Sequence, residues 1–159
     1  MRRSALLRPV KPARSRLAAL LRAATRARRH AYAPYSNFQV GAAVLAGGRI
    51  FAAGNVENSA YPLCVCAERN AVALAVSAGF RRIDAVAVVA GEGRPAPPCG
   101  GCRQVLAEFC AASTPILYAA TTGRSVITTL AGLLPDAFGA ADLAPQSEPA
   151  RSAAKRRSR

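Results

Sequence analysis

The chain has 159 residues and is 52% hydrophobic, which suits one compact domain with its own core. Its formal net charge is +14 at pH 7, and no apolar run approaches the roughly 20 residues of a membrane-spanning helix, so we expect no membrane partner. Five cysteines, an odd number without a visible export signal, argue against a disulfide framework and for the reducing cytoplasm.

The predicted elements begin with a basic arm over residues 1–13, which contains two prolines. An amphipathic helix with an arginine-rich outer face is expected over about 14–29. Gly47 and Gly48 separate two apolar segments, which predicts a β-hairpin.

An irregular loop over 54–65 leads into the second half of the chain. A helix over about 66–78 has an entirely apolar centre, so it is expected to be buried on most sides, with Gly79 as its C-cap. The apolar run at 85–90 predicts a strand that is covered on both faces. Further predictions, in chain order, are a helix over about 100–110, strands over 116–120 and 125–128, and a short helix before Pro135.

This order predicts an α/β fold in which one sheet is sandwiched by helices. The folded domain is expected over 14–143, followed by a basic disordered tail over 144–159. Residues 1–30 contain ten basic residues and no acidic one, whereas residues 31–149 contain seven arginines against eight acidic residues. Because the excess charge belongs to the ends, we expect at most weak binding of nucleic acid or anionic surfaces there.

Three cysteines and one glutamate carry the chemistry that the sequence indicates. Cys66 stands two residues before Glu68, and Cys99 and Cys102 lie in a Pro-Cys-Gly-Gly-Cys segment. Three thiolates can hold zinc and leave its fourth position open, whereas a structural site needs a fourth protein ligand. A nearby carboxylate can move protons at the open position. The pattern agrees with the all-cysteine signature of zinc deaminases that act on nucleobases.

Two arginines follow these ligands on the same predicted helices. One or both of Arg69 and Arg103 are predicted to donate hydrogen bonds to cysteine sulfur and so draw charge from the metal. The alternative for both is a salt-bridged surface arginine. For Glu68 the alternative is a carboxylate that only interacts favourably with a helix N-terminus. Cys64 competes with Cys66 as a ligand, but it lacks the glutamate two residues later.

These motifs resemble the cytidine deaminases, in particular the small homotetrameric branch whose zinc has three cysteine ligands. The resemblance covers about residues 14–143, so only the charged ends fall outside it. The segments that carry it are Ala31–Phe38, Val40–Ala43, Asn55–Asn58, Cys66–Arg69, Pro98–Val105 and Leu133–Phe138.

The resemblance implies a three-layer α/β/α sandwich around a mixed, roughly five-stranded sheet. It implies one zinc per subunit, held by Cys66, Cys99 and Cys102, with Glu68 as the catalytic proton carrier. The implied reaction is the hydrolytic deamination of cytidine and deoxycytidine to uridine and deoxyuridine, with release of ammonia. This reaction belongs to pyrimidine salvage in the cytoplasm.

The resemblance also implies substrate contacts. Asn55 and Glu57 would hydrogen-bond the ribose, for which the alternative is loop capping. Phe38 would pack on the pyrimidine, for which the alternative is core packing, and Ala67 would offer backbone groups to the base. Residues that would reach a neighbouring subunit's site, making the active sites of a homotetramer shared, are Ser59, Tyr61 and Phe138.

Three other interpretations remain open from the sequence. A related zinc deaminase could act on a cytosine-containing antibiotic or on nucleic acid instead of a nucleoside. A non-catalytic, zinc-stabilised RNA-binding protein belongs to another class, and it would need a fourth ligand from Cys64, Cys110 or His30. None of these three has suitable spacing, and Cys64 and Cys110 are predicted to be small buried hydrophobic residues.

Overall fold

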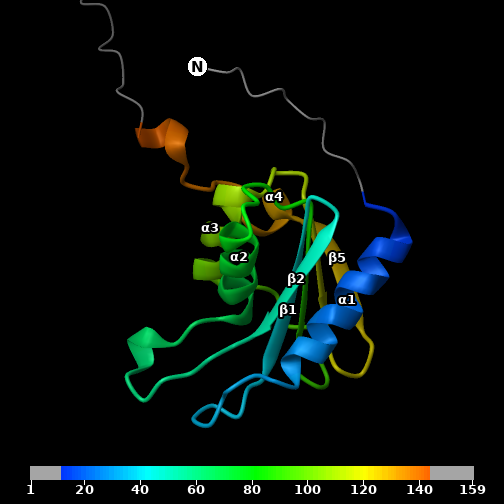
Figure 1. The fold of residues 1–159 in the computed structure, drawn as a ribbon, viewed down its shortest axis with the longest axis vertical. Coiled ribbons are helices and arrows are strands. Elements are labelled where there is room, and N and C mark those ends of the chain that lie inside the picture. The colour runs from blue at the N-terminus through cyan, green and yellow to red at the C-terminus, as the bar shows by residue number, and fades with distance from the viewer. Residues whose placement is uncertain (1–11, 144–159) are drawn as a thin grey trace, which may run out of the picture.

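The computed structural model describes residues 12–143 as a mixed sheet with flanking helices (Figure 1). The predicted tail and all but the last two residues of the predicted arm lie outside the described residues. The elements are α1 (Arg14–Arg28), β1 (Val40–Ala46), β2 (Arg49–Gly54), the 3-10 helix η1 (Tyr61–Leu63), α2 (Ala67–Ser77), β3 (Ala85–Ala90), α3 (Gly100–Phe109), β4 (Pro115–Ala119), β5 (Ser125–Thr129), α4 (Leu130–Leu133) and the 3-10 helix η2 (Ala140–Leu143).

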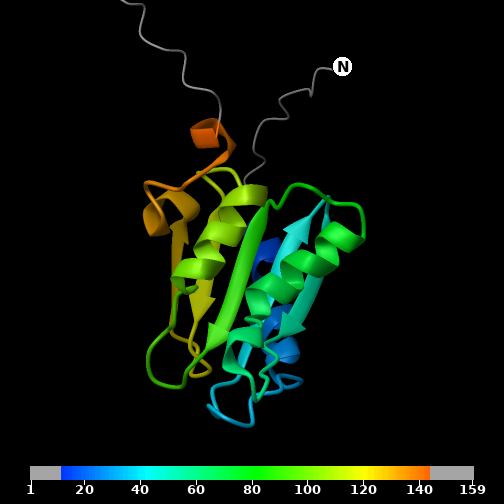
Figure 2. The same cartoon turned by 90° about the vertical axis from the view of Figure 1, so that its left-hand side faces the viewer.

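The sheet has five strands in the order β2-β1-β3-β4-β5. Only β3 and β4 pair in parallel, and the other neighbours are antiparallel. Helix α1 lies on one face of the sheet, and α2 and α3 lie on the other (Figures 1 and 2). The three-layer α/β/α arrangement that the resemblance implied is confirmed.

Helix α1 packs closely on the sheet because its inner face is small. Leu20, Ala23 and Ala24 are buried against β1 and β3. At Gly41 of β1 a Cβ atom would overlap the carbonyl oxygen of Ala24 and lie 2.5 Å from the backbone nitrogen of Arg28. Glycine at this position therefore sets how near the helix can come.

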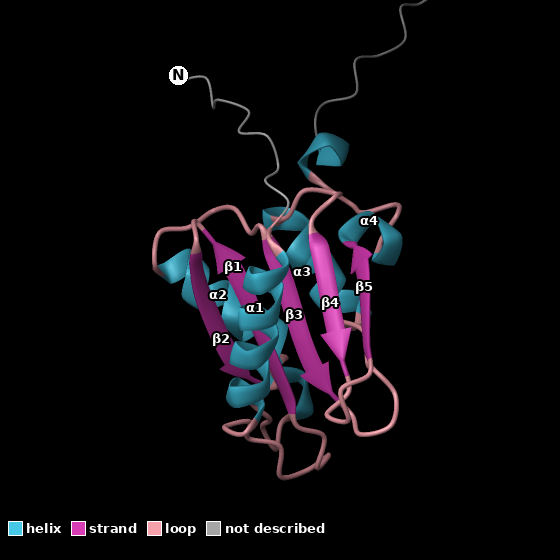
Figure 3. Ribbon diagram, turned by 90° about the vertical axis from the view of Figure 1, so that its right-hand side faces the viewer, coloured by secondary structure: helices cyan, strands magenta, loops and turns pink. Residues whose placement is uncertain are grey.

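The hairpin and the central strand follow the predicted pattern. Gly47 and Gly48 have φ angles of 55° and 80°, which matches the left-handed backbone of a tight hairpin turn. Every residue of β3 is buried, because helices cover both of its faces. Figure 3 shows that α1 covers β1, β2 and β3, whereas no described helix lies over β4 and β5 on that side.

The prediction that the second helix is buried on most sides is wrong for the single chain. Ala71, Val72 and Ala75 of α2 face the sheet, but Ala73 is exposed and Leu74 is 49% exposed. The helix lies on the surface of the sheet, so this chain covers only the residues on the helix face that meets the sheet. The C-cap residue of α2 is Ala78, and Gly79 directly after it has a φ of 90°, so the glycine lies one position after the C-cap rather than at it as predicted. None of the described helices is both long and apolar enough to cross a membrane.

Candidate metal centre and active site

Three thiols converge where α2 and α3 begin. Cys66 is the N-cap residue of α2, Cys99 is the N-cap residue of α3, and Cys102 lies in the first turn of α3. Their sulfur atoms all lie within 4.8 Å of one another, and the Cys66 and Cys99 sulfurs are 4.0 Å apart. A tetrahedral zinc with Zn–S bonds of about 2.3 Å spaces its sulfurs by about 3.8 Å. The three cysteines therefore fit one zinc ion.

The Cys66 and Cys102 thiols oppose each other's deprotonation. The pKa of Cys66 is lowered to about 6, mainly because the Cys102 thiol donates a hydrogen bond to it, with help from Cys99 and the charge of Arg69. The pKa of Cys102 is raised, because its proton is held by Cys66 and its thiol is buried. A negative charge on one sulfur thus opposes deprotonation of a second thiol, and a bound cation would favour the deprotonated form of both.

The carboxyl of Glu68 lies in the first turn of α2 and is only 4% exposed. Burial raises its pKa, the thiolate of Cys66 raises it further, and a hydrogen bond with Cys102 opposes the shift. A buried carboxyl with a raised pKa is suited to accept a proton in one step of a reaction and to donate it in another. A carboxylate whose only role is to interact with the helix N-terminus, the alternative for this residue, does not need to be buried.

A loop after β2 runs beside the segment that leads to Cys66. Val56 pairs on one side with Tyr32 and on the other with Val65. The Val56 and Val65 backbones exchange hydrogen bonds of 3.0 and 2.9 Å. This pairing brings the residues on either side of Val56 next to the start of α2.

Asn55 is buried and connects β1 to the loop before it. Its Oδ1 accepts a hydrogen bond from the Val40 backbone nitrogen at 2.8 Å, and its Nδ2 donates to the Phe38 carbonyl at 3.1 Å. The amide thus caps the loop, which was the alternative to ribose binding in the sequence analysis. Nδ2 carries two hydrogens, so one hydrogen remains for a further acceptor.

Glu57 caps the neighbouring turn in the same way. Its carboxylate accepts hydrogen bonds from the backbone nitrogens of Tyr35 at 2.9 Å and Ser36 at 3.2 Å, and from the Ser36 hydroxyl. These bonds, the one from the hydroxyl first, lower the pKa of Glu57. A carboxylate has about four lone-pair sites, so acceptor capacity remains for an additional donor.

The other residues expected to contact substrate differ in exposure. Phe38, Tyr61 and Phe138 are 47%, 67% and 59% exposed, so the single chain does not pack them in its core. The rings of Tyr61 and Tyr35 meet edge to face at a centroid distance of 5.8 Å. Ser59 is also exposed, whereas Ala67, the first residue of α2, is fully buried.

Arg103 makes different contacts from those that the sequence suggested. Its Nε donates to the Pro98 carbonyl and its Nη1 to the Leu133 carbonyl, both at 2.8 Å. It therefore connects the residue before Cys99 to the last residue of α4. Arg69 is exposed, and its charge helps to lower the pKa of Cys66.

Three polar residues that position the site were not singled out from the sequence. Ser36 holds Glu57, as described above. Asn70 donates from Nδ2 to the Gly54 carbonyl at 3.0 Å, which ties α2 to the end of β2. Gln104 donates from Nε2 to the Phe138 carbonyl at 2.7 Å. Ser36 and Gln104 stand inside the segments that carry the family resemblance, and Asn70 directly follows one.

The two remaining cysteines stay outside this group. Cys64 is half-buried, and its sulfur accepts a hydrogen bond from the Asn58 backbone nitrogen at 3.3 Å. Cys110 is half-buried beside the core, and burial raises its pKa to about 12. Within residues 12–143, only the three predicted cysteines form a cluster able to hold a metal ion.

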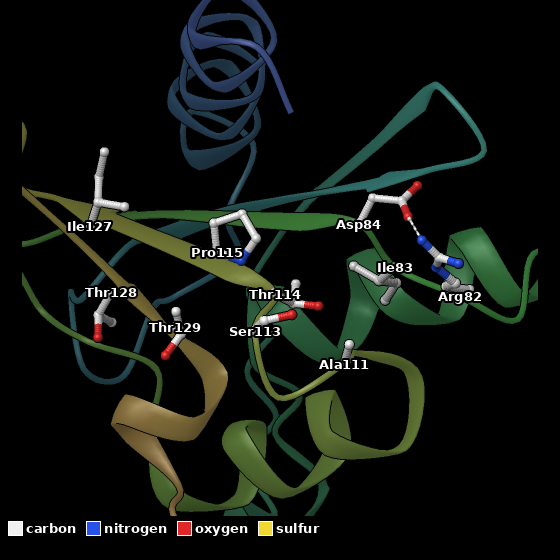
Figure 4. A pocket seen from close by; sticks show the side chains of 10 residues that line it. All are labelled: Arg82, Ile83, Asp84, Ala111, Ser113, Thr114, Pro115, Ile127, Thr128 and Thr129. Carbon is white, nitrogen blue, oxygen red and sulfur yellow. Dashed lines mark ion pairs between the residues drawn. The ribbon is translucent and has the colours of Figure 1, made fainter. Parts of the chain in front are cut away.

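A separate pocket of about 500 Å³ lies near the amino ends of β3 and β4 (Figure 4). Arg82 and Asp84 form an ion pair of 3.2 Å at its edge. The cysteines of α3, in contrast, follow the carboxyl end of β3. The pocket and the thiol cluster therefore lie at opposite ends of the sheet.

Comparisons with known proteins agree with this geometry. A family model described as the cytidine and deoxycytidylate deaminase zinc-binding region matches residues 14–118. A cytidine deaminase of Sporosarcina psychrophila is 49% identical over 130 residues, which are 81% of this chain and 96% of the relative. One from Mycobacterium tuberculosis is 46% identical over 121 residues, 76% of this chain and 87% of that relative. The crystal structure of a Burkholderia pseudomallei cytidine deaminase superposes with a TM-score of 0.73 at 46% identity and covers 76% of this chain and 98% of that one.

Proposed function

The chain belongs to the cytidine and deoxycytidylate deaminase family, and from this premise we propose how its residues carry out the zinc-dependent hydrolytic deamination of cytidine. The observation that supports the mechanism is a buried carboxyl, Glu68, beside three convergent thiols. The net reaction consumes cytidine and water and gives uridine and ammonia. With three cysteines clustered in the described residues and no fourth, a closed structural zinc site has no support.

Cys66, Cys99 and Cys102 would hold one zinc ion per chain. When bound, zinc supplies Lewis-acid activation of a water molecule at its open position. The N-termini of α2 and α3 point at the thiolates, and their partial positive charges offset the excess negative charge. The protein thus supplies both the donor set and part of its charge balance.

Glu68 moves the protons of the reaction. Its carboxylate accepts a proton from the attacking water and gives it to the ring nitrogen next to the carbon that bears the amine. Loss of a second proton from the added oxygen lets Glu68 protonate the departing amine, which leaves as ammonia. The raised pKa keeps the group able to act in both directions.

Asn55 and Glu57 recognise the sugar in this proposal. The free Nδ2 hydrogen of Asn55 and the spare acceptor positions of Glu57 suit a ribose hydroxyl, which needs both a donor and an acceptor. If that hydroxyl is the 3′ group, deoxycytidine is a substrate as well. The exposed ring of Phe38 would pack on the pyrimidine, and the backbone of Ala67 would contact the base.

The proposed setting is pyrimidine salvage in the cytoplasm. A site built on three thiols needs those thiols reduced, which the cytoplasm provides. The product uridine is a nucleoside that can be reused. Activity on both cytidine and deoxycytidine, with no activity on a cytosine-containing antibiotic or oligonucleotide, would support this setting over the two alternative substrates.

We also propose a homotetramer with shared active sites. Leu74 on the outer face of α2 and the exposed Tyr61 and Phe138 are large apolar side chains that this chain leaves uncovered. Ser59 lies in the same loop as Tyr61. Mixing a Glu68→Gln protein with a Phe138→Ala protein tests this arrangement: hybrid tetramers should regain activity, whereas independent sites would regain none.

The test of the mechanism follows the ultraviolet absorbance of cytidine with the native chain and with Glu68→Gln. The substitution keeps the size of the side chain but removes its proton-carrying capacity, so we expect a rate loss of about 10²–10⁴-fold with zinc retained. Glu108→Gln on α3 is the matched control and should keep full activity. Full activity of a zinc-loaded Glu68→Gln protein would refute the role of Glu68.

A further inference from the structure

The outer face of α1 carries a row of arginines that neither the fold nor the deaminase site uses. Its members are Arg14, Arg22 and Arg26 of α1 and Arg29, the C-cap residue directly after it, and all four are exposed. At about 100° per residue they fall within an arc of about 120° on the helix. The buried residues Leu20, Ala23, Ala24 and Ala27 lie on the opposite side of the helix. These four arginines form the arginine face.

The arginine face has no partner within the described residues. None of its four side chains makes an ion pair or a side-chain hydrogen bond in residues 12–143. Two neighbours on the same helix differ, since Arg16 donates to the Gly48 carbonyl at 2.9 Å and Arg28 donates to the Gln39 carbonyl at 3.0 Å. The arginines that stabilise the fold are therefore distinct from those of the face.

Nothing in the local sequence neutralises this charge. Residues 1–30 contain no acidic residue, and the eleven residues before the described part add Arg2, Arg3, Arg8 and Lys11. Like charges on one helix face repel each other and cost a little stability. A surface of this kind is typical of proteins that meet a polyanion.

We propose that the arginine face of α1 binds the phosphate backbone of nucleic acid. A guanidinium donates paired hydrogen bonds to phosphate oxygens and keeps its charge at every relevant pH. Arg22, Arg26 and Arg29 span about 10 Å of a rigid helix at about 1.5 Å per residue, so they can contact successive phosphates. The other exposed side chains on this side of the helix belong to Ser15, Ala18 and Thr25, which offer no aromatic ring for stacking on bases. The binding is therefore independent of base sequence.

Two other occupants fit the face less well. A membrane-surface helix inserts its apolar side into lipid, but the apolar side of α1 already packs on the sheet. A second copy of the chain offers too little negative charge, because the whole chain has 8 acidic residues against 22 basic ones. Nucleic acid supplies a continuous line of phosphate charge that matches the row.

The arginine face is separate from the deaminase site. Helix α1 lies on one side of the sheet, and α2 and α3, which carry the cysteines, lie on the other (Figure 1). Bound nucleic acid would thus be held away from the thiols and would not become a substrate. Cytidine and the polyanion should bind without competition.

The test compares two double variants of the full chain that each remove two charges. Arg22→Gln/Arg26→Gln changes the face, and Arg94→Gln/Arg124→Gln changes two exposed loop arginines. Glutamine is a good helix former, so α1 should persist. Fluorescence anisotropy with a labelled 30-nucleotide oligouridine, which the deaminase reaction cannot alter, gives the affinity between about 50 and 200 mM salt.

We expect the first variant to bind about tenfold more weakly and to lower the slope of log affinity against log salt by about 1.4, because each lost phosphate contact to a single strand contributes about 0.7. The control should change by less than about twofold, and excess cytidine should not displace the RNA. Equal losses in both variants, or no loss in either, would overturn the proposal. If the native chain binds phosphatidylserine vesicles more tightly than the oligouridine, the face is assigned to a membrane surface instead. If the first variant changes the oligomeric mass, the face is assigned to contact with a second copy of the chain. Cytidine turnover stays unchanged in both variants, so failure here leaves the deaminase mechanism untouched.

Discussion

Replacing Arg103 by lysine distinguishes two ways in which this residue can support the metal centre. In the structure the guanidinium holds the Pro98 and Leu133 carbonyls together at 2.8 Å each. Lysine keeps the positive charge but has a single ammonium in place of the planar fork, so it cannot make both bonds. If charge near the sulfurs is what matters, lysine is an adequate replacement; if the two carbonyl bonds matter, it is not.

The size of the effect follows from the two bonds. A hydrogen bond from a charged donor contributes about 1.5–3 kcal/mol. The Arg103 side chain is only half-buried, so the lower value applies and water recovers part of it, which leaves a loss of about 2 kcal/mol for both bonds. For a domain of this size that loss lowers the melting temperature by about 6–10 °C. Because Pro98 precedes Cys99, we also expect zinc affinity to fall about 10- to 100-fold, as when support of a metal ligand is lost.

Two measurements decide between the roles. Thermal unfolding of the zinc-loaded protein gives the stability, and competition with a chromophoric chelator gives the zinc affinity. Arg94→Lys, in an exposed loop, is the matched control and should change neither. Unchanged zinc affinity in Arg103→Lys would show that holding the two carbonyls does not support the metal centre.

Three further predictions concern the packing, the loop and the metal. Gly41→Ala should destabilise the chain by at least about 2 kcal/mol in chemical unfolding, because its Cβ overlaps α1, whereas Gly93→Ala, with open space around it, should be neutral. The lowered pKa of Glu57 means that its bonds to Tyr35 and Ser36 persist until the pH falls below the ordinary value of 4.5, so amide signals of these two residues that shift above pH 4.5 would contradict the assignment. Chelation of zinc should lower the melting temperature, since a metal present at about 1,000 times its Kd adds about 4 kcal/mol; an unchanged melting temperature would mean that the folded chain binds no zinc.

The architecture could be predicted because its signals are local. The diglycine turn, the fully apolar β3 and the glycine after α2 each report on their own few residues, and the boundaries agree with the structure within about two residues. The extent of burial of α2 could not be predicted in this way. Ala73 and Leu74 are as apolar as their buried neighbours, and only the position of the sheet determines which of them it covers.

The three cysteine ligands could also be predicted from the sequence, because their spacing along the chain can be read directly from it. The roles of the polar residues were not, since they depend on which carbonyl lies nearby after folding. Arg103 looked like a partner of sulfur but bonds to two carbonyls from distant segments. The family resemblance implied that Asn55 and Glu57 are sugar ligands, and the contacts that the structure shows for them hold the loop that carries Phe38. The sequence alone does not distinguish a side chain that holds a loop at the site from one that binds the substrate.

The five-stranded sheet also separates two helix-covered surfaces, one that carries the metal ligands and one that carries the arginine face. Residues on the α2 and α3 side position the metal ligands. The outer residues of α1 contact neither the core nor that site. Substitution of the outer arginines of α1 should therefore leave catalysis in place. Grafting the four arginines onto the matching helix of a less basic relative should confer affinity for RNA and leave the chemistry of the recipient enzyme in place.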